Sequence, residues 1–171
     1  MNNSKAKKFA KIAVIASLYA VCTLVFAPIS YGPFQFRISE CLCVLAFFYA
    51  EGIVGLTIGC FIANLFGNGP LDIIFGTLAT LIASTLSFVT AKFIRNKIVK
   101  FIACSLYPIL VNAIIVPFTF LALTELKSAY LISAFQVFFG QAVVILTLGA
   151  IVYFAIEKMI ARGNTLFKNS P

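Results

Sequence analysis

Long apolar runs fill this chain, and charged residues are largely confined to the short segments between them. An α-helix needs about 20 apolar residues to cross a bilayer. A membrane β-barrel would instead show segments of about 10 residues in which apolar and polar positions alternate. The pattern predicts an all-α integral membrane bundle of six helices in one domain over residues 1–171, with helices at about 9–27, 38–50, 53–65, 71–91, 98–123 and 130–156.

The apolar run from Ile38 to Leu65 could form one helix or two, because it is too long for one membrane span and short for two full ones. Glu51 and Gly52 interrupt it, so we predict two short helices, Ile38–Ala50 and Ile53–Leu65. With two helices, the basic loop of residues 92–100 falls on the side of the N-terminus. With one helix, it would fall on the opposite side.

The basic residues indicate the orientation. On this topology all 13 Lys and Arg residues except Arg37 and Lys127 lie on the side of the two termini. Because cytoplasmic loops carry the excess of Lys and Arg, both termini are predicted to be cytoplasmic. The apolar region from Ile12 to Ile29 is longer than the 7–15 residues of a signal-peptide core, so we expect the first helix to be retained.

The composition excludes several classes of function. Charged residues make up 11% of the chain and apolar residues 62%, whereas soluble domains carry about a quarter charged residues. With no histidine and no CxxC pair among five cysteines, we expect no zinc site, no cofactor and no His-dependent catalysis. No GxxxxGK phosphate loop occurs, so ATP hydrolysis is not expected of this chain, which is predicted not to be an enzyme. The net charge of +8 follows the topology and does not indicate nucleic-acid binding.

Polar residues gather in the predicted outer half of the bundle, on several helices. A charge at the bilayer centre costs about 2.5–3.5 kcal/mol, so such groups are expected to face one another around a pocket. Acidic acceptors, amides and nearby aromatic rings suit a flat heteroaromatic ligand with N–H donors. The candidate substrate-binding residues are Gln35, Arg37, Glu40, Asn64, Asp72, Thr77, Asn112 and Gln136.

Each of these groups also has a purely structural interpretation. Arg37 and Glu40 have the spacing of an ion pair on one helix face. Asp72 and Asn64 stand where helix caps are expected. Gln136 and Gln141 could hydrogen-bond between helices. The sequence leaves these alternatives open.

Small residues recur along one face of the first helix at Ala6, Ala10, Ala13, Ser17 and Ala20. Their spacings of four and three place them on one side of the helix. In a membrane, small side chains let two helix backbones approach closely. The approaching helix belongs either to this chain or to a partner protein.

The segments Ser30-Tyr-Gly-Pro-Phe-Gln-Phe-Arg-Ile-Ser-Glu40 and Gly59-Cys-Phe-Ile-Ala-Asn64, followed by Asp72 and Gly76-Thr-Leu-Ala-Thr80, resemble those of the QueT-type queuosine-precursor transporters. The proteins of this family are substrate-binding (S) components of energy-coupling factor uptake systems. The resemblance covers nearly the whole chain and is most specific from Gln35 to Thr80.

The resemblance implies a multi-pass protein of the bacterial cell membrane whose pocket takes a 7-deazaguanine such as 7-cyano-7-deazaguanine, its aminomethyl form or queuine. It implies docking on an energy-coupling transmembrane subunit with two ATPase subunits, through Ala13, Ala16, Ser17 and Ala20. It also supports Gln35, Arg37, Glu40, Asn64 and Asp72 as substrate-site residues. The alternatives are an S component for another vitamin or nucleobase and a small homo-oligomeric secondary carrier.

Overall fold

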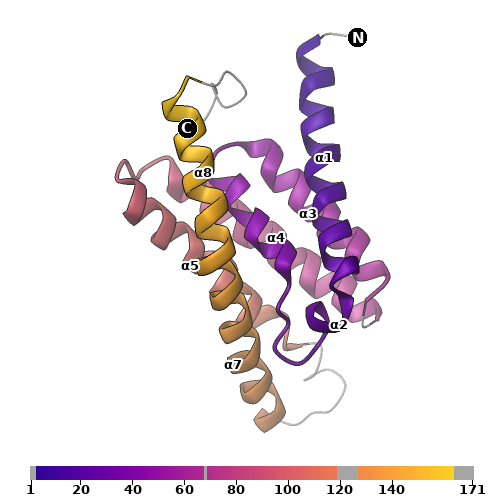
Figure 1. Ribbon diagram of the computed structural model, residues 1–171. Coiled ribbons are helices and arrows are strands. Elements are labelled where there is room, and N and C mark those ends of the chain that lie inside the picture. Colours follow the sequence, from indigo (N-terminus) through magenta and orange to yellow (C-terminus); the bar gives the residue numbers. More distant parts are fainter. Residues whose placement is uncertain (1–2, 68, 119–126, 164–171) are drawn as a thin grey trace.

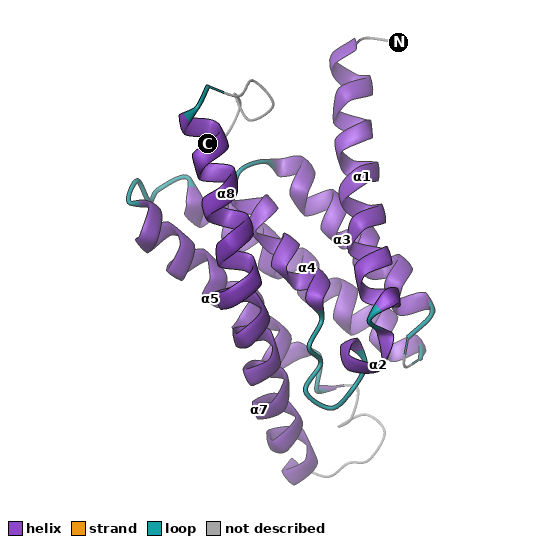
Figure 2. Ribbon diagram, viewed as in Figure 1, coloured by secondary structure: helices purple, strands orange, loops and turns teal. Residues whose placement is uncertain are grey.

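The computed structural model describes residues 3–67, 69–118 and 127–163, which contain helices and loops but no strand (Figures 1 and 2). The predicted all-α class is therefore confirmed. The α-helices are α1 (Asn3–Val25), α2 (Ala27–Ser30), α3 (Ala50–Leu65), α4 (Pro70–Ala91), α5 (Lys97–Ile115), α7 (Lys127–Val144) and α8 (Ala150–Ala161). A 3₁₀-helix, η1 (Ile38–Phe47), precedes α3, and a π-helical segment, η2 (Ile145–Gly149), joins α7 to α8.

Within the described ranges, four helical segments are long and apolar enough to cross a membrane: Lys5–Val25, Pro70–Ala91, Lys97–Ile115 and Ala129–Ala161. The helices Ile38–Phe47 and Ala50–Leu65 are apolar but shorter. Large apolar side chains are exposed along the outer faces of the bundle, as in a multi-pass membrane protein. The count of six crossings stays a prediction.

The boundary between the second and third predicted helices is wrong. The break lies at Phe48 and Tyr49, and Glu51 and Gly52 belong to the first turn of α3. A Cβ on Gly52 would lie 2.9 Å from the backbone nitrogen of Ala46. The glycine therefore allows α3 to fold back against the end of η1, and it does not end a helix.

The predicted helix 98–123 is also wrong beyond Ile115. A turn at Val116 and Pro117 ends α5 there, because proline has no N–H to continue the helical hydrogen bonds. The predicted end at Leu123 lies outside the described residues. The last predicted helix is longer than expected, since the helical segment continues through η2 to Ala161.

The short helix η1 lies at the centre of the bundle and contacts α1, α3, α4, α5, α7 and α8. Next to it, α1 packs closely on α3 because two glycines of α3 leave room. A Cβ on Gly55 would lie 2.7 Å from Cβ of Ile15, and one on Gly59 would lie 2.8 Å from the carbonyl oxygen of Ala16. These contacts hold the N-terminal helix against the part of the bundle that carries the polar residues.

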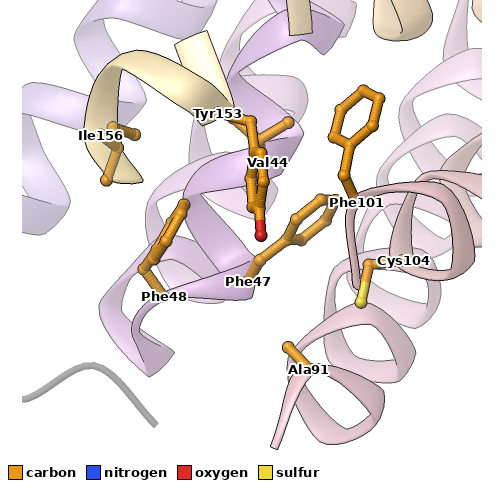
Figure 3. Packing of buried hydrophobic residues seen from close by; sticks show 8 residues of the cluster. All are labelled: Val44, Phe47, Phe48, Ala91, Phe101, Cys104, Tyr153 and Ile156. Carbon is orange, nitrogen blue, oxygen red and sulfur yellow. The ribbon is translucent and has the colours of Figure 1, made fainter. Parts of the chain in front are cut away.

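An aromatic cluster surrounds Tyr153 of α8 (Figure 3). The Tyr153 ring lies 5.3 Å from that of Phe48 and 5.2 Å from that of Phe101. Its hydroxyl donates to the backbone carbonyl of Lys97 at 3.1 Å. The cluster joins η1, α5 and α8 by packing, with its central hydroxyl satisfied.

Helix α1 begins and α8 ends at the same end of the bundle, the upper end in Figure 1. The loop between α4 and α5 also lies toward that end, so the basic segments of α1, of residues 92–100 and of α8 share it. The loop from Tyr31 to Arg37 lies at the opposite end (Figure 1). The cytoplasmic placement of the termini stays a prediction.

Candidate functional site

Buried polar side chains gather where the loop before η1 meets the end of α3 and the start of α4. The exposed fractions of Arg37, Glu40, Asn64 and Asp72 are 3%, 1%, 1% and 5%. All three charged residues that are fully buried in the described chain belong to this polar cluster. Groups of this kind are costly to bury unless they are paired or bind a ligand.

The loop that carries Arg37 has a strained and tightly seated conformation. Gln35 has a φ of 46°, which is uncommon for a residue with a side chain. The Gln35 N–H donates to the carbonyl of Gly32, and the Arg37 N–H donates to the carbonyl of Gln35. A Cβ on Gly140 of α7 would lie 1.8 Å from the carbonyl oxygen of Phe34, so only glycine allows the loop to approach α7 this closely.

The Arg37 guanidinium is held between an aromatic ring and a thiol. Its Cζ lies 5.6 Å from the centre of the Tyr31 ring, and Nη1 donates weakly to Sγ of Cys60 at 4.0 Å. The Tyr31 hydroxyl is anchored by donating to the carbonyl of Ala63 at 2.6 Å. Burial lowers the pKa of Arg37, but the titratable groups around it, in order Cys60, Tyr19, Glu40 and Asp72, raise that pKa by more, to above its ordinary value.

Asn64 ties the end of α3 to the start of α4. Its Nδ2 donates to the backbone carbonyl of Asp72 at 3.0 Å and to Sγ of Cys60 at 3.3 Å. A Cβ on Gly76 would lie 2.6 Å from this Nδ2 and 3.7 Å from Nη1 of Arg37. Asn64 and Arg37 therefore meet over Gly76 and against the same cysteine.

Glu40 connects the polar cluster to α1. The Tyr19 hydroxyl donates to Oε1 of Glu40 at 2.5 Å, and the Cys43 thiol donates to Oε2 at 2.7 Å. The hydroxyls of Thr23 and Ser39 share a second hydrogen bond between α1 and η1, of 2.6 Å. Glu40 forms no ion pair with Arg37 among the described contacts, so the ion-pair alternative for these two residues is wrong.

Several polar atoms in and near the polar cluster find no hydrogen-bond partner in the described part of the chain. Buried polar groups in proteins are nearly always hydrogen-bonded, so each such atom needs an explanation. Their concentration at one end of the molecule suits groups that meet a ligand. They are Oε1 of Gln35, Nε and Nη2 of Arg37, Oδ1 of Asn64, Oγ1 of Thr77 and Oε1 of Gln141.

The structure brings some of the predicted substrate residues together and leaves others apart. Arg37 and Asn64 both contact Sγ of Cys60, and Asn64 also donates to the backbone carbonyl of Asp72. Asn112 is buried on α5 and Gln136 is half-buried on α7, and within the described ranges neither hydrogen-bonds to the polar cluster. Asn64 links two helices, so the end-cap alternative for it is wrong.

Four residues of this region were not among the predicted substrate-binding residues: Tyr19, Cys60, Gly76 and Gln141. Cys60 precedes Asn64 by four residues, so helical spacing places both on one face of α3. Tyr19 is fully buried on the inner face of α1 and carries a polar group. An apolar-looking cysteine and a tyrosine among small residues give little signal without the fold.

The predicted docking residues fall on two faces of α1. Ala16 and Ala20 are buried, and Ala16 packs on Gly59 of α3. Ala13 and Ser17 are exposed. Of the two possibilities for the small residues, packing within the chain accounts for Ala16 and Ala20, and only Ala13 and Ser17 remain accessible to a partner.

The model of a family described as QueT transporter matches residues 9–158, a range that contains every residue of the polar cluster. The chain belongs to the QueT transporter family. It is also similar to the Queuosine precursor transporter QueT of Lactococcus lactis subsp. cremoris (strain MG1363), with 43% identity over 84 residues, which are 48% of this chain and 50% of that protein. The match thus spans about half the length of this curated relative. No solved structure matches the chain significantly.

Proposed function

We propose that this chain is the substrate-binding membrane subunit of an energy-coupling factor transporter that takes up queuosine precursors. The expected ligands are 7-deazaguanines: 7-cyano-7-deazaguanine, its aminomethyl form or queuine. The observation that carries the proposal is the polar cluster, in which Arg37 and Asn64 are fully buried with partnerless polar atoms in a member of a transporter family. The name of the Lactococcus lactis relative supports the choice of substrate.

The charges of the polar cluster favour a ligand rich in N–H donors. One buried cation, Arg37, stands with two buried carboxylates, Glu40 and Asp72. An anionic ligand such as a phosphate would meet repulsion from the two acids, and it would find only one arginine to bind it. A deazaguanine is uncharged at its pyrimidine ring and presents both donors and acceptors.

The orientation follows from the basic residues. Under the positive-inside rule, the end of the bundle with the basic segments faces the cytoplasm of a bacterial cell. The loop from Tyr31 to Arg37 lies at the other end, so the polar cluster would receive its ligand from outside (Figure 1). Transport then requires the loaded subunit to release the base on the cytoplasmic side.

Energy for uptake would come from an energy-coupling transmembrane subunit with two ATPase subunits. The exposed face of α1, at Ala13 and Ser17, is the proposed docking surface, because small side chains there allow close helix contact. Tyr19 and Thr23, on the buried face of α1, are hydrogen-bonded to η1. Docking on one face of α1 therefore acts on the helix that holds Glu40.

Isothermal titration of the purified chain against 7-cyano-7-deazaguanine, guanine and a panel of vitamins tests the ligand. Saturable binding of the deazaguanine is expected, and binding of a vitamin in its place would favour an S component of other specificity. Uptake assays with and without the coupling and ATPase subunits test the motor. Uptake that persists without these subunits would contradict the proposal and favour a small homo-oligomeric carrier.

The docking surface has its own test. Ala13→Leu is expected to leave binding intact while reducing uptake and copurification with the ATPase subunits. Val14→Leu, at an exposed position beside it, is the matched control. Unchanged copurification of Ala13→Leu would show that the coupling subunit docks elsewhere.

A further inference from the structure

We propose that Arg37 and Asn64 read one edge of the bound base, on which a hydrogen-bond acceptor stands beside an N–H donor, and that Glu40 positions this pair without touching the ligand. The inference rests on the proposed function, and it assigns roles within the same site. Three observations carry it: the free edge of the Arg37 guanidinium, the fixed orientation of the Asn64 amide, and the occupied carboxylate of Glu40.

The Arg37 guanidinium offers one edge. Its Nη1 points to Sγ of Cys60, and its face lies by the Tyr31 ring. The N–H groups of Nε and Nη2 lie along one edge of the planar group, and neither has a partner among the described residues. Two parallel donors of this kind bind a carbonyl oxygen or a pair of neighbouring acceptors.

The Asn64 amide offers an acceptor, and its orientation is fixed by the backbone. A carbonyl oxygen only accepts, so the atom that lies 3.0 Å from the Asp72 carbonyl has to be the amide nitrogen. The other atom is therefore Oδ1, which has no partner in the described ranges although the side chain is 1% exposed. It requires an N–H or O–H donor from a ligand.

The Arg37 and Asn64 side chains lie against the same cysteine. Nη1 of Arg37 and Nδ2 of Asn64 lie 4.0 and 3.3 Å from the same Cys60 sulfur. The absence of a side chain at Gly76 lets the Asn64 amide lie close to α4, since a Cβ there would be 2.6 Å from Nδ2. A guanine-type ring has a carbonyl oxygen at C6 beside the N1–H, so it matches this pair with its acceptor toward Arg37 and its donor toward Asn64.

Glu40 is already occupied. Its two oxygens accept from the Tyr19 hydroxyl and the Cys43 thiol, and the side chain is 1% exposed. It can hold η1 against α1 and balance the charge of Arg37, but a ligand donor would have to displace one of these bonds. Glu40 is therefore a positioning residue.

The test compares two bases on the wild-type chain by isothermal titration. The first is 7-cyano-7-deazaguanine. The second is its 2,6-diamino analogue, in which the C6 oxygen becomes an amino donor and N1 becomes an acceptor. Because both hydrogen bonds of the pair are reversed, the analogue is expected to bind at least about 100-fold more weakly.

Three variants then assign the preference to residues. Arg37→Lys keeps the charge but loses the donor edge, and Asn64→Leu removes the acceptor, so each is expected to reduce the preference to less than about tenfold. Glu40→Gln is expected to weaken the binding of both bases by the same factor, so that the preference for 7-cyano-7-deazaguanine is unchanged. Thr85→Val, at an exposed position of α4, is the matched control, and circular dichroism verifies the fold of each variant.

The outcomes separate the two proposals. Failure to bind either base overturns the proposed function, and this inference with it. Equal binding of the two bases by the wild type overturns the inference alone. The inference is also overturned if Glu40→Gln abolishes the preference for 7-cyano-7-deazaguanine while Arg37→Lys and Asn64→Leu both retain that preference. The wild-type comparison needs no variant, so misfolding of one variant leaves the test decisive.

Discussion

The aromatic cluster around Tyr153 and the polar cluster around Cys60 are both buried in one bundle and both involve η1. In the aromatic cluster, the Tyr153 hydroxyl donates to a backbone carbonyl, and the Ser87 hydroxyl donates to the carbonyl of Cys104 at 2.9 Å. In the polar cluster, Arg37 and Asn64 keep partnerless donors and acceptors. The first arrangement is that of a structural core, and the second is the one that we propose binds the substrate.

The Lys97–Glu157 ion pair beside the aromatic cluster extends this contrast. It measures 2.8 Å, and the Lys97 side chain is 56% exposed, so water shares in its solvation. Arg37 has no such exposure and no ion pair among the described contacts. One end of the molecule is thus expected to tolerate changes of charge better than the other.

The largest effect is expected for Arg37→Met. It removes the positive charge near the buried Glu40 carboxylate, and an uncompensated buried charge costs about 3–5 kcal/mol of unfolding free energy. It also removes the donor edge of the site. Thermal unfolding in detergent and titration with 7-cyano-7-deazaguanine should both show large losses. Arg95→Met, at an exposed position, is the control, and unchanged affinity in Arg37→Met would contradict the account.

Phe47→Ala is expected to cost nearly as much stability but no affinity. Phe47 is fully buried beside Tyr153, and truncation of a buried aromatic ring costs about 3–5 kcal/mol of unfolding free energy. The Kd for the deazaguanine should stay within about twofold of the wild type, because Phe47 belongs to the aromatic cluster and not to the polar cluster. Phe93→Ala, in which the lost side chain is 81% exposed, is the control. A Kd that worsens in step with stability would mean that the two clusters are not separate.

Gly76→Ala is expected to weaken binding about tenfold, or about 1.4 kcal/mol. The added Cβ would lie 2.6 Å from Nδ2 of Asn64 and displace the amide. Gly149→Ala is the matched control by the aromatic cluster, because a Cβ there meets nothing closer than 3.5 Å. Titration should show a change only for Gly76→Ala, and the opposite ranking would contradict the assignment.

The smallest effect is expected for Thr77→Val, and it has opposite signs for stability and binding. The Thr77 hydroxyl is buried without a partner in the described chain, so its replacement by a methyl group should raise the unfolding free energy by about 1 kcal/mol. Binding should weaken severalfold. Thr80→Val is the control. The Thr80 hydroxyl donates to the carbonyl of Gly76 at 3.0 Å, so its removal should lower the unfolding free energy. A destabilised Thr77→Val would show that its hydroxyl serves the fold.

The helical class and several helix ends were predictable, because apolar runs and Gly-Pro or basic loops mark them directly. The prediction placed α4 within one residue of Pro70–Ala91. It failed at Gly52 and Pro117. Gly52 serves a close contact between η1 and α3 that only the tertiary structure reveals, and Pro117 ends α5 although the apolar run continues past it.

The candidate site was predictable as a set of residues but not as an arrangement. A common depth indicated Arg37, Asn64 and Asp72, and the structure brings these three together. The predicted depth of a residue in the membrane does not show which side of its helix the side chain is on. Asn112 and Gln136 were therefore included in the predicted site on depth alone. It also missed Cys60, since nothing in the sequence distinguishes a thiol that contacts a guanidinium from one that fills a core.

A structure of the purified chain with 7-cyano-7-deazaguanine bound would show whether Arg37 and Asn64 hold the base. The base is expected in the polar cluster, with its C6 oxygen within hydrogen-bonding distance of Nε and Nη2 of Arg37 and its N1–H directed at Oδ1 of Asn64. A base bound elsewhere in the bundle, with both side chains arranged as they are without it, would contradict the claim.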